Sequence, residues 1–201
     1  MTTLRSLLVL AAAFALLPFL LSGASAQQLG KPIFCDGAYA LCIKAACKTI
    51  VKNGKPTKFA NCECEVRHGI SMGPQKCQAR LPVMRNGMTY LISTYSNLYN
   101  KTNQTMSCSN SGQQWTWCYG KPCVVDSADP SKATCKCPIF QGPMQTLGGD
   151  CGTKGGGCDG LWSGARPRAD NAANRLFARY QTKQGNPHFG PAGFCSSNST
   201  Q

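Results

Sequence analysis

The sequence predicts a small, disulfide-rich protein of mixed α and β structure, built from two duplicated six-cysteine modules with a few short helices. Three observations lead to this fold class. The 201-residue chain contains 14 cysteines, an even number. Most of them fall into two sets of six with nearly the same spacing, and each set includes a C-x-C pair that follows a turn signal. Disulfides are therefore expected to replace much of an apolar core.

The first 26 residues have the pattern of an export signal. Arg5 precedes an apolar run over residues 7–21, and Ala24-Ser25-Ala26 forms a cleavage site of the small-x-small type. The run is too short to span a bilayer, and no later segment has the roughly 20 apolar residues that a spanning helix requires. We expect cleavage near Ala26 and export to the periplasm or the medium, and the style of the leader is bacterial.

The composition alone would predict a disordered chain. The sequence has 21 Lys and Arg residues against 8 Asp and Glu, a formal net charge of +13, and few large aliphatic residues follow the leader. Such a chain buries too little apolar surface to offset its conformational entropy. An oxidised cysteine framework changes that prediction, because each disulfide contributes about 2 to 4 kcal/mol by restricting the unfolded chain.

The two cysteine sets are interpreted as an internal duplication. The first has the spacing C-x6-C-x4-C-x14-C-x-C-x12-C and the second C-x9-C-x4-C-x11-C-x-C-x13-C. A Gly-Pro dipeptide follows each C-x-C pair, at Gly73-Pro74 and at Gly142-Pro143. The first set is Cys35, Cys42, Cys47, Cys62, Cys64 and Cys77, the second is Cys108, Cys118, Cys123, Cys135, Cys137 and Cys151, and Cys158 and Cys195 remain as an extra pair.

Each module is predicted to contain a β-hairpin that ends in the C-x-C strand. In the first module a β-branched run precedes the turn Asn53-Gly54, and in the second a Val-Val pair precedes a turn through Asp129-Pro130. Residues i and i+2 of a strand share a face, so both cysteines of a pair point one way while Glu63 and Lys136 point the other way. Neighbouring cysteines on one face are expected to anchor two different disulfides.

Three short helices are predicted around the hairpins. Asp36 is a candidate N-cap for a helix over residues 37–47. Apolar residues at helical spacing over 88–100 favour a second helix over a strand, although Asn86-Gly87 is also a hairpin turn signal. The third follows Asp170, and its apolar face is formed by Ala173, Leu176, Phe177 and Tyr180.

The predicted organisation has four parts. They are an export signal at 1–26, the first module with its following helix at 27–104, the second module at 105–158, and a basic helical tail at 159–201 that the last cysteine ties down. The polar stretch from Thr105 to Gln114 is interpreted as the linker between the modules.

The C-x-C pairs raise the question of metal or redox chemistry. Thiolate sites for zinc or Cu(I) need reduced sulfur, and zinc sites prefer C-x2-C or wider spacings. Copper is the favoured metal if thiols are free, because Met72, Met84 and Met88 lie near the first module. Redox dithiols of the thioredoxin type use C-x2-C, which this chain lacks. We therefore expect structural disulfides, with no metal and no cofactor.

No familiar catalytic arrangement is present, whether G-x-S-x-G, H-E-x-x-H or a GK[ST] loop. The string Arg67-His68-Gly69 resembles the nucleophile motif of histidine phosphatases. The arginine that follows in that family is missing here, and the only other histidine, His188, has no acidic neighbour. His68 is interpreted as a polar residue beside a turn. We predict that the protein is not an enzyme, unless the two histidines converge in one pocket.

Two features favour binding. The alternation of Trp115, Trp117 and Tyr119 places three rings on one face of an extended segment, where they either fill the small core or offer a surface to sugars or proteins, and the core is favoured. Basic clusters in the first module and in the tail attract polyanions. The candidate basic residues are Lys52, Lys55, Lys58, Arg166, Arg168, Arg175 and Arg179.

The sequence therefore predicts an exported, non-enzymatic protein that binds a polyanionic envelope component or another exported protein. The main alternative is a secreted inhibitor or toxin-like module that uses a hairpin tip, at residues 53–57 or 126–132, as a rigid insertion loop. A copper-binding protein and an enzyme rank below it. No sequence-specific nucleic-acid reader is expected. The disulfide connectivity, the partner and the oligomeric state stay open.

Overall fold

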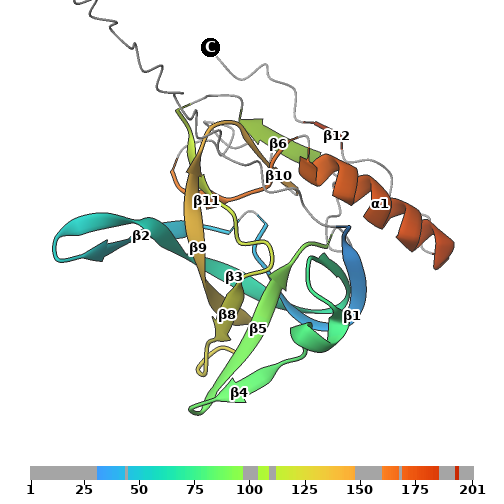
Figure 1. Ribbon diagram of the computed structural model, residues 1–201, viewed down its shortest axis with the longest axis horizontal. Coiled ribbons are helices and arrows are strands. Elements are labelled where there is room, and N and C mark those ends of the chain that lie inside the picture. The colour runs from blue at the N-terminus through green and yellow to red at the C-terminus, as the bar shows by residue number, and fades with distance from the viewer. Residues whose placement is uncertain are drawn as a thin grey trace, which may run out of the picture.

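The structure is a computed structural model that describes residues 31–43, 45–96, 104–108, 112–147, 160–167, 169–185 and 193–194. The predicted export signal lies outside these ranges. In the described part of the chain, β-strands dominate and one α-helix packs beside them (Figure 1). The expectation of a disulfide-rich fold is confirmed, whereas the predicted share of helix is too large.

The strands of the larger sheet are short except for β1, β3 and β9. They are β1 (Ile33–Leu41), β2 (Cys47–Lys52), β3 (Lys55–Gly73), β4 (Val83–Arg85), β5 (Met88–Thr94), β7 (Gln114–Thr116), β8 (Pro122–Val125), β9 (Lys132–Gln141) and β11 (Trp162–Ser163). A smaller sheet contains β10 (Met144–Leu147), β6 (Gln104–Cys108) and β12 (Gly193–Phe194). The helices are the 3-10 turn η1 (Cys77–Arg80) and α1 (Ala169–Lys183).

The larger sheet closes on itself. Its order is β11-β7-β9-β8-β5-β1-β3-β2, and β3 also pairs with β9, so β9, β8, β5, β1 and β3 form a ring. On the other side of the β3–β9 pair, β11 approaches β2, because the backbone N–H of Cys47 donates to the carbonyl of Leu161 at 2.9 Å. Closure leaves few strand edges open to other chains.

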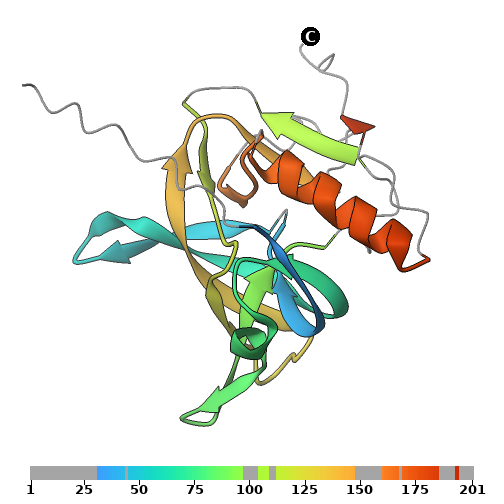
Figure 2. The same cartoon turned by 45° about the vertical axis from the view of Figure 1, so that its right-hand side comes forward.

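Both predicted hairpins are confirmed. Asn53 and Gly54 connect β2 to β3 with φ angles of 49° and 72°, the left-handed geometry of a two-residue hairpin turn. In the second hairpin, the turn before β9 is closed by a hydrogen bond of 2.9 Å from the N–H of Lys132 to the carbonyl of Asp129. The β2–β3 hairpin projects far from the ring of strands in both views (Figures 1 and 2).

The helix predicted over 37–47 is wrong, because β1 occupies most of that segment. All nine residues of β1 pair with β3 in antiparallel register. At the centre of this ladder Gly37 lies opposite Gly69, and both have positive φ, 147° and 114°, which bends the two strands together. The long-range ladder therefore outweighs the local helical signals around Asp36.

The helix predicted over 88–100 is also wrong in its described part. Asn86 and Gly87, with φ of 49° and 73°, form a hairpin turn between β4 and β5. β5 then lies between β1 and β8 and pairs with both. A strand bonded on both edges gains backbone hydrogen bonds that the sequence pattern does not reveal. Residues 97–100 lie outside the described ranges.

The third predicted helix is confirmed as α1. Ala173 and Phe177 are buried as expected, but Leu176 is 40% exposed. Tyr180 stacks on Phe34 of β1 with ring centroids 4.5 Å apart, so α1 packs against β1. The predicted linker from Thr105 to Gln114 is wrong in part, because it includes most of β6 and the start of β7.

Disulfides form the centre of the fold. Every described cysteine is oxidised, and the bridges between described cysteines are Cys35–Cys77, Cys42–Cys64, Cys47–Cys62, Cys118–Cys137 and Cys123–Cys135. Each C-x-C pair buries both cysteines and anchors two different bridges, as predicted. Glu63 and Lys136, between the paired cysteines, are exposed on the opposite face.

Several strand pairings in the first half of the chain have a counterpart in the second half. β5 runs parallel to β1, and β11 runs parallel to β7. Met72 forms an isolated backbone β-bridge with Tyr95, and Gln145 forms one with Ala165. Gly142, with φ of 120°, stands as far beyond Cys135 as Gly69 stands beyond Cys62.

The match between the two Gly-Pro dipeptides that the sequence suggested is wrong. The dipeptides Gly73-Pro74 and Gly142-Pro143 do not occupy equivalent places, because Gly73 ends the β1–β3 ladder opposite Ile33 while Gly142 directly follows β9. The glycine that matches Gly142 in position and in positive φ is Gly69.

Candidate functional site

The β2–β3 hairpin is the most basic projecting element in the described part of the chain. Lys48, Lys52, Lys55 and Lys58 are all exposed, and no acidic residue stands between Cys47 and Cys62. The disulfide between these two cysteines joins directly paired residues at the base of the hairpin. The arm is therefore clamped where it leaves the body of the protein.

The strand register shows which residues of the arm lie beside one another. Asn61 of β3 pairs with Lys48 on one side and with Lys136 of β9 on the other, while Lys52 pairs with Lys55 near the tip. Alternate residues of a strand share a face, so Lys48, Phe59 and Lys136 lie on the face opposite the buried cysteines. Lys52 and Lys55 lie beyond the register shift between Thr49 and Val51, nearer the tip. We call this set the basic face, and it consists of Lys48, Lys52, Lys55, Phe59 and Lys136.

Phe59 adds an exposed ring to the basic face. Its side chain is 42% exposed, and the Nζ atom of Lys136 lies 4.9 Å from the ring centroid. This cation–π contact holds the ammonium group beside the ring at the surface. Sequence reasoning missed Phe59 and Lys136 as binding residues, although both follow from the alternation that turns Cys62 and Cys135 inward.

The charges of the arm are not neutralised locally. The ion pairs seen in the described ranges are Arg67–Glu65 and Lys132–Asp129, and neither involves a lysine of the arm. Lys52 and Lys55 lie directly opposite each other, and like charges at paired positions destabilise a hairpin. Lys58, which the sequence analysis grouped with them, is exposed and precedes Phe59 in the part of β3 where the register shifts.

The predicted aromatic stripe lies inside the protein. Trp115, Trp117 and Tyr119 are all buried and belong to the second core cluster. Trp115 stacks on Phe140 at 5.4 Å between ring centroids. These rings therefore fill the space between β7, β9 and the neighbouring elements.

The basic residues of the tail do not join the arm. Arg175 and Arg179 are exposed on α1, which lies on the opposite side of the molecule from the β2–β3 hairpin in both views (Figures 1 and 2). Arg166 is half-buried, with its guanidinium carbon 4.4 Å from the centroid of the Trp117 ring. Arg168 lies outside the described residues.

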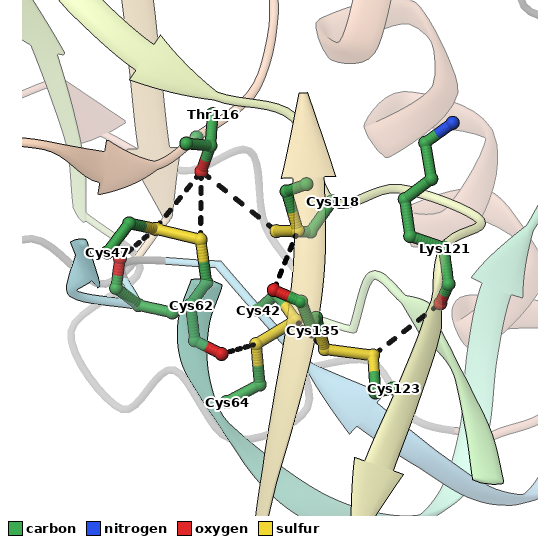
Figure 3. Close-up of a disulfide and its surroundings, with 12 residues drawn as sticks. Cys42, Cys47, Cys62, Cys64, Thr116, Cys118, Lys121, Cys123 and Cys135 are labelled. Carbon is green, nitrogen blue, oxygen red and sulfur yellow. Dashed lines mark hydrogen bonds between the residues drawn. A yellow bond between two sulfur atoms is a disulfide. The ribbon is translucent and has the colours of Figure 1, made fainter. Parts of the chain in front are cut away.

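Four of the bridges, Cys42–Cys64, Cys47–Cys62, Cys118–Cys137 and Cys123–Cys135, gather in one cluster (Figure 3). Cys42 Sγ lies 3.0 Å from Cys135 Sγ, in a different bridge. The hydroxyl oxygen of Thr116 lies 3.1 Å from Cys47 Sγ and 3.2 Å from Cys62 Sγ. Groups of these sulfurs lie within 4.8 Å of one another, a spacing that would suit a metal ion. As disulfides, however, they are not the thiolate donors that such a site requires.

The methionines considered for copper binding lie on different elements, and His68 is the described one of the two histidines considered for catalysis. Met72 is buried near the end of β3, whereas Met84 and Met88 are exposed on the β4–β5 hairpin. His68 is exposed within β3 opposite Ala38, so its interpretation as a residue beside a turn is wrong. His188 lies outside the described residues.

No protein-family model, curated protein or solved structure matches this chain. None of the helices in the described ranges combines the length and the apolarity needed to cross a membrane.

Proposed function

We propose that this is an exported, non-enzymatic binding protein whose basic face docks on a polyanion of the cell envelope. The observation that carries the proposal is the projecting hairpin with four exposed lysines and no acid between its base cysteines. A cationic surface without local counter-charges attracts polyanions over several ångströms. The clamp at Cys47 and Cys62 limits the conformational freedom that binding would otherwise remove.

Export is part of this proposal. The leader with its site near Ala26 supports it, and so does the oxidised state of every described cysteine, since disulfides persist in oxidising compartments. Outside the cytoplasm, the candidate polyanions are lipopolysaccharide, an acidic polysaccharide, an anionic membrane surface and extracellular DNA.

We also propose that the two cysteine sets descend from one duplicated module. In the first set the first and sixth cysteines pair, as do the second and fifth, and the third and fourth. In the second set the second pairs with the fifth and the third with the fourth. The isolated backbone β-bridges Met72–Tyr95 and Gln145–Ala165 also support a duplication. Under this proposal, the long basic arm belongs to the first of the two copies.

The test compares two variants of equal net charge. The first variant replaces Lys48, Lys52, Lys55 and Lys136 with Gln. The control variant also introduces Gln, at four exposed basic residues elsewhere, namely Lys76, Arg85, Arg175 and Arg179. Binding to immobilised polygalacturonate is measured over a range of salt concentrations, with neutral dextran as the blank. We expect the first variant to lose at least about tenfold in affinity and the control to lose much less. Equal losses would show general charge attraction and would refute the site.

A second candidate function uses the same arm differently. Val51, near the tip, is 60% exposed, which favours insertion of the hairpin into an apolar site of another protein. Such an inhibitor-like complex would resist salt, whereas polyanion binding weakens as salt screens the charges. The salt series therefore separates the two functions.

A further inference from the structure

The Cys35–Cys77 bridge is the most exposed of the bridges between described cysteines. Cys77 of η1 is exposed, and Cys35 of β1 is 8% exposed. In the other four of these bridges every cysteine is at most 2% exposed except Cys47, which is half-buried. Cys35 and Cys77 also belong to neither of the two core clusters. A reagent in solution can therefore approach this bridge more easily than the others.

This bridge fastens the connection between β3 and β4 to the ring of strands. The connection covers residues 74–82, and Arg80 is its buried residue. Side-chain hydrogen bonds also hold it. Arg80 Nη2 donates to the carbonyl of Ile33 at 3.0 Å, and Gln75 Nε2 donates to the carbonyl of Gly120 at 2.7 Å. The bridges of the first core cluster do not involve this connection. Opening the exposed bridge would therefore free one surface segment and leave the central disulfides in place.

Two cations accompany this bridge. Lys76 is exposed and directly precedes Cys77. Arg80 lines the same small pocket as both cysteines, and its Nε and Nη1 atoms are buried with no hydrogen-bond partner in the described part of the chain. Cations beside a sulfur favour the thiolate over the thiol. Asp36, in the same lining, opposes this effect with a single charge. A thiolate released here would thus gain a net positive environment.

We propose that Cys35–Cys77 is a thiol-exchange site that reacts with thiols outside the cytoplasm while the buried bridges stay closed. Exposed disulfides are the labile ones in proteins, because a thiolate must reach a sulfur atom to displace its partner. The proposal concerns a reaction and not the binding of a polyanion, so it is independent of the basic face.

The exchange has two steps. The thiolate of an external thiol attacks Sγ of the exposed Cys77 and forms a new S–S bond there, while the Cys35–Cys77 bond breaks and its electron pair leaves on Cys35 Sγ. A second external thiolate then attacks the external sulfur of the mixed disulfide and releases Cys77 as a thiolate. The two thiolates of the protein take up protons. The external thiols are thereby oxidised to a disulfide, and the bridge is reduced by two electrons.

The first test is a time course of reduction on the oxidised mature protein. Glutathione at millimolar concentrations is added, samples are quenched with acid, free thiols are alkylated, and the labelled positions are mapped by mass spectrometry. We expect Cys35 and Cys77 to be labelled at least about tenfold faster than the cysteines of the other four bridges, while far-UV circular dichroism stays unchanged. Labelling of all these cysteines at one rate, or of a buried bridge first, would overturn the proposal.

A parallel time course with a reduced dithiol protein of the thioredoxin type distinguishes the source of the thiol. Selective opening by glutathione identifies a small thiol as a sufficient partner. Selective opening by the dithiol protein alone identifies a protein partner. If neither probe opens Cys35–Cys77 ahead of the buried bridges, the site is not a thiol-exchange site.

Two matched variants test the direction of attack. Cys35→Ala and Cys77→Ala each remove the same bridge and leave one thiol, at the exposed and at the buried position respectively. With oxidised glutathione, Cys77 in the first variant should form a mixed disulfide at least about tenfold faster than Cys35 in the second. Equal rates in folded variants would contradict attack at Cys77. If either variant fails to fold, the wild-type time course still decides the proposal.

Discussion

Cys62 of β3 lies directly opposite Cys135 of β9, and each is cross-linked to its neighbour on the outer side, Cys47 of β2 and Cys123 of β8. The four cysteines therefore form one row across four strands, since Cys47 pairs with Cys62 and Cys123 pairs with Cys135 in strand register. The row joins the two halves of the chain through backbone hydrogen bonds and ties each half internally through sulfur.

The proposed duplication predicts the pairing of Cys108. This cysteine is oxidised, and in the first set the cysteine in the same position pairs with the sixth. We expect disulfide mapping of the mature protein by mass spectrometry to find Cys108–Cys151, which leaves Cys158 and Cys195 for each other. A bridge from Cys108 to Cys158 or Cys195 would contradict the duplication.

Reduction should unfold the protein. The first core cluster consists mostly of oxidised cysteines and small side chains, so little apolar contact remains within that cluster once the bridges are broken. We expect a strong reductant to abolish the cooperative thermal transition and to shift far-UV circular dichroism toward an unfolded chain. A thermal midpoint unchanged after complete reduction, verified by a thiol count, would disprove the claim that disulfides replace the core.

Phe59→Ala should separate ring contacts from charge contacts on the basic face. The change removes the exposed ring beside Lys136 but leaves every lysine in place. We expect the affinity for polygalacturonate to fall by about threefold while the salt dependence keeps its slope, because the number of cations is unchanged. Met84→Ala offers a control, since it also removes an exposed apolar side chain but lies on the β4–β5 hairpin, away from the basic face. Similar losses in both variants would argue against a role for Phe59.

The turn before β9 should show a low carboxylate pKa. The Ser131 hydroxyl and then the Lys132 ammonium donate to Asp129 and lower its pKa below the ordinary value. The charged carboxylate therefore adds stability above the pKa of the unfolded chain, and this is lost as pH falls through the lower folded value. Its effect is small because solvent reaches the Asp129 side chain and screens its charge.

An NMR titration of the Asp129 side chain would measure this shift directly. Ser131→Ala should move the midpoint back toward the ordinary value of an aspartate, and Ser127→Ala, at an exposed position of the same turn region, should leave it unchanged. A midpoint for Asp129 at the ordinary value in the wild-type protein would show that the turn hydrogen bonds are absent in solution.

Local chemistry made the hairpins and the cysteine faces predictable. Asn53-Gly54 is a turn signal that acts over four residues, and the period of two in a strand places Cys62 and Cys64 together whatever partner they find. The same period identifies Glu63 and Lys136 as outward residues. The basic arm could therefore be anticipated in part, although Phe59 was overlooked on the same face.

Long-range pairing decided the rest. The segment 88–94 carries both a helical spacing and a hairpin signal, and it is a strand because β1 and β8, remote in sequence, bond to its two edges. Arg80 is buried because Gly73 leaves space beside it, a relation that no sequence pattern contains. The connectivity of the disulfides depends on the same pairings.

The sequence by itself determined the oxidised, basic character of this protein, its two hairpins and the direction in which each C-x-C pair points. These properties follow from composition and from contacts within a few residues. Tertiary structure alone decided which strands are neighbours, which rings are buried and which lysines share a face, because hydrogen bonds and close packing between distant segments have no local signature.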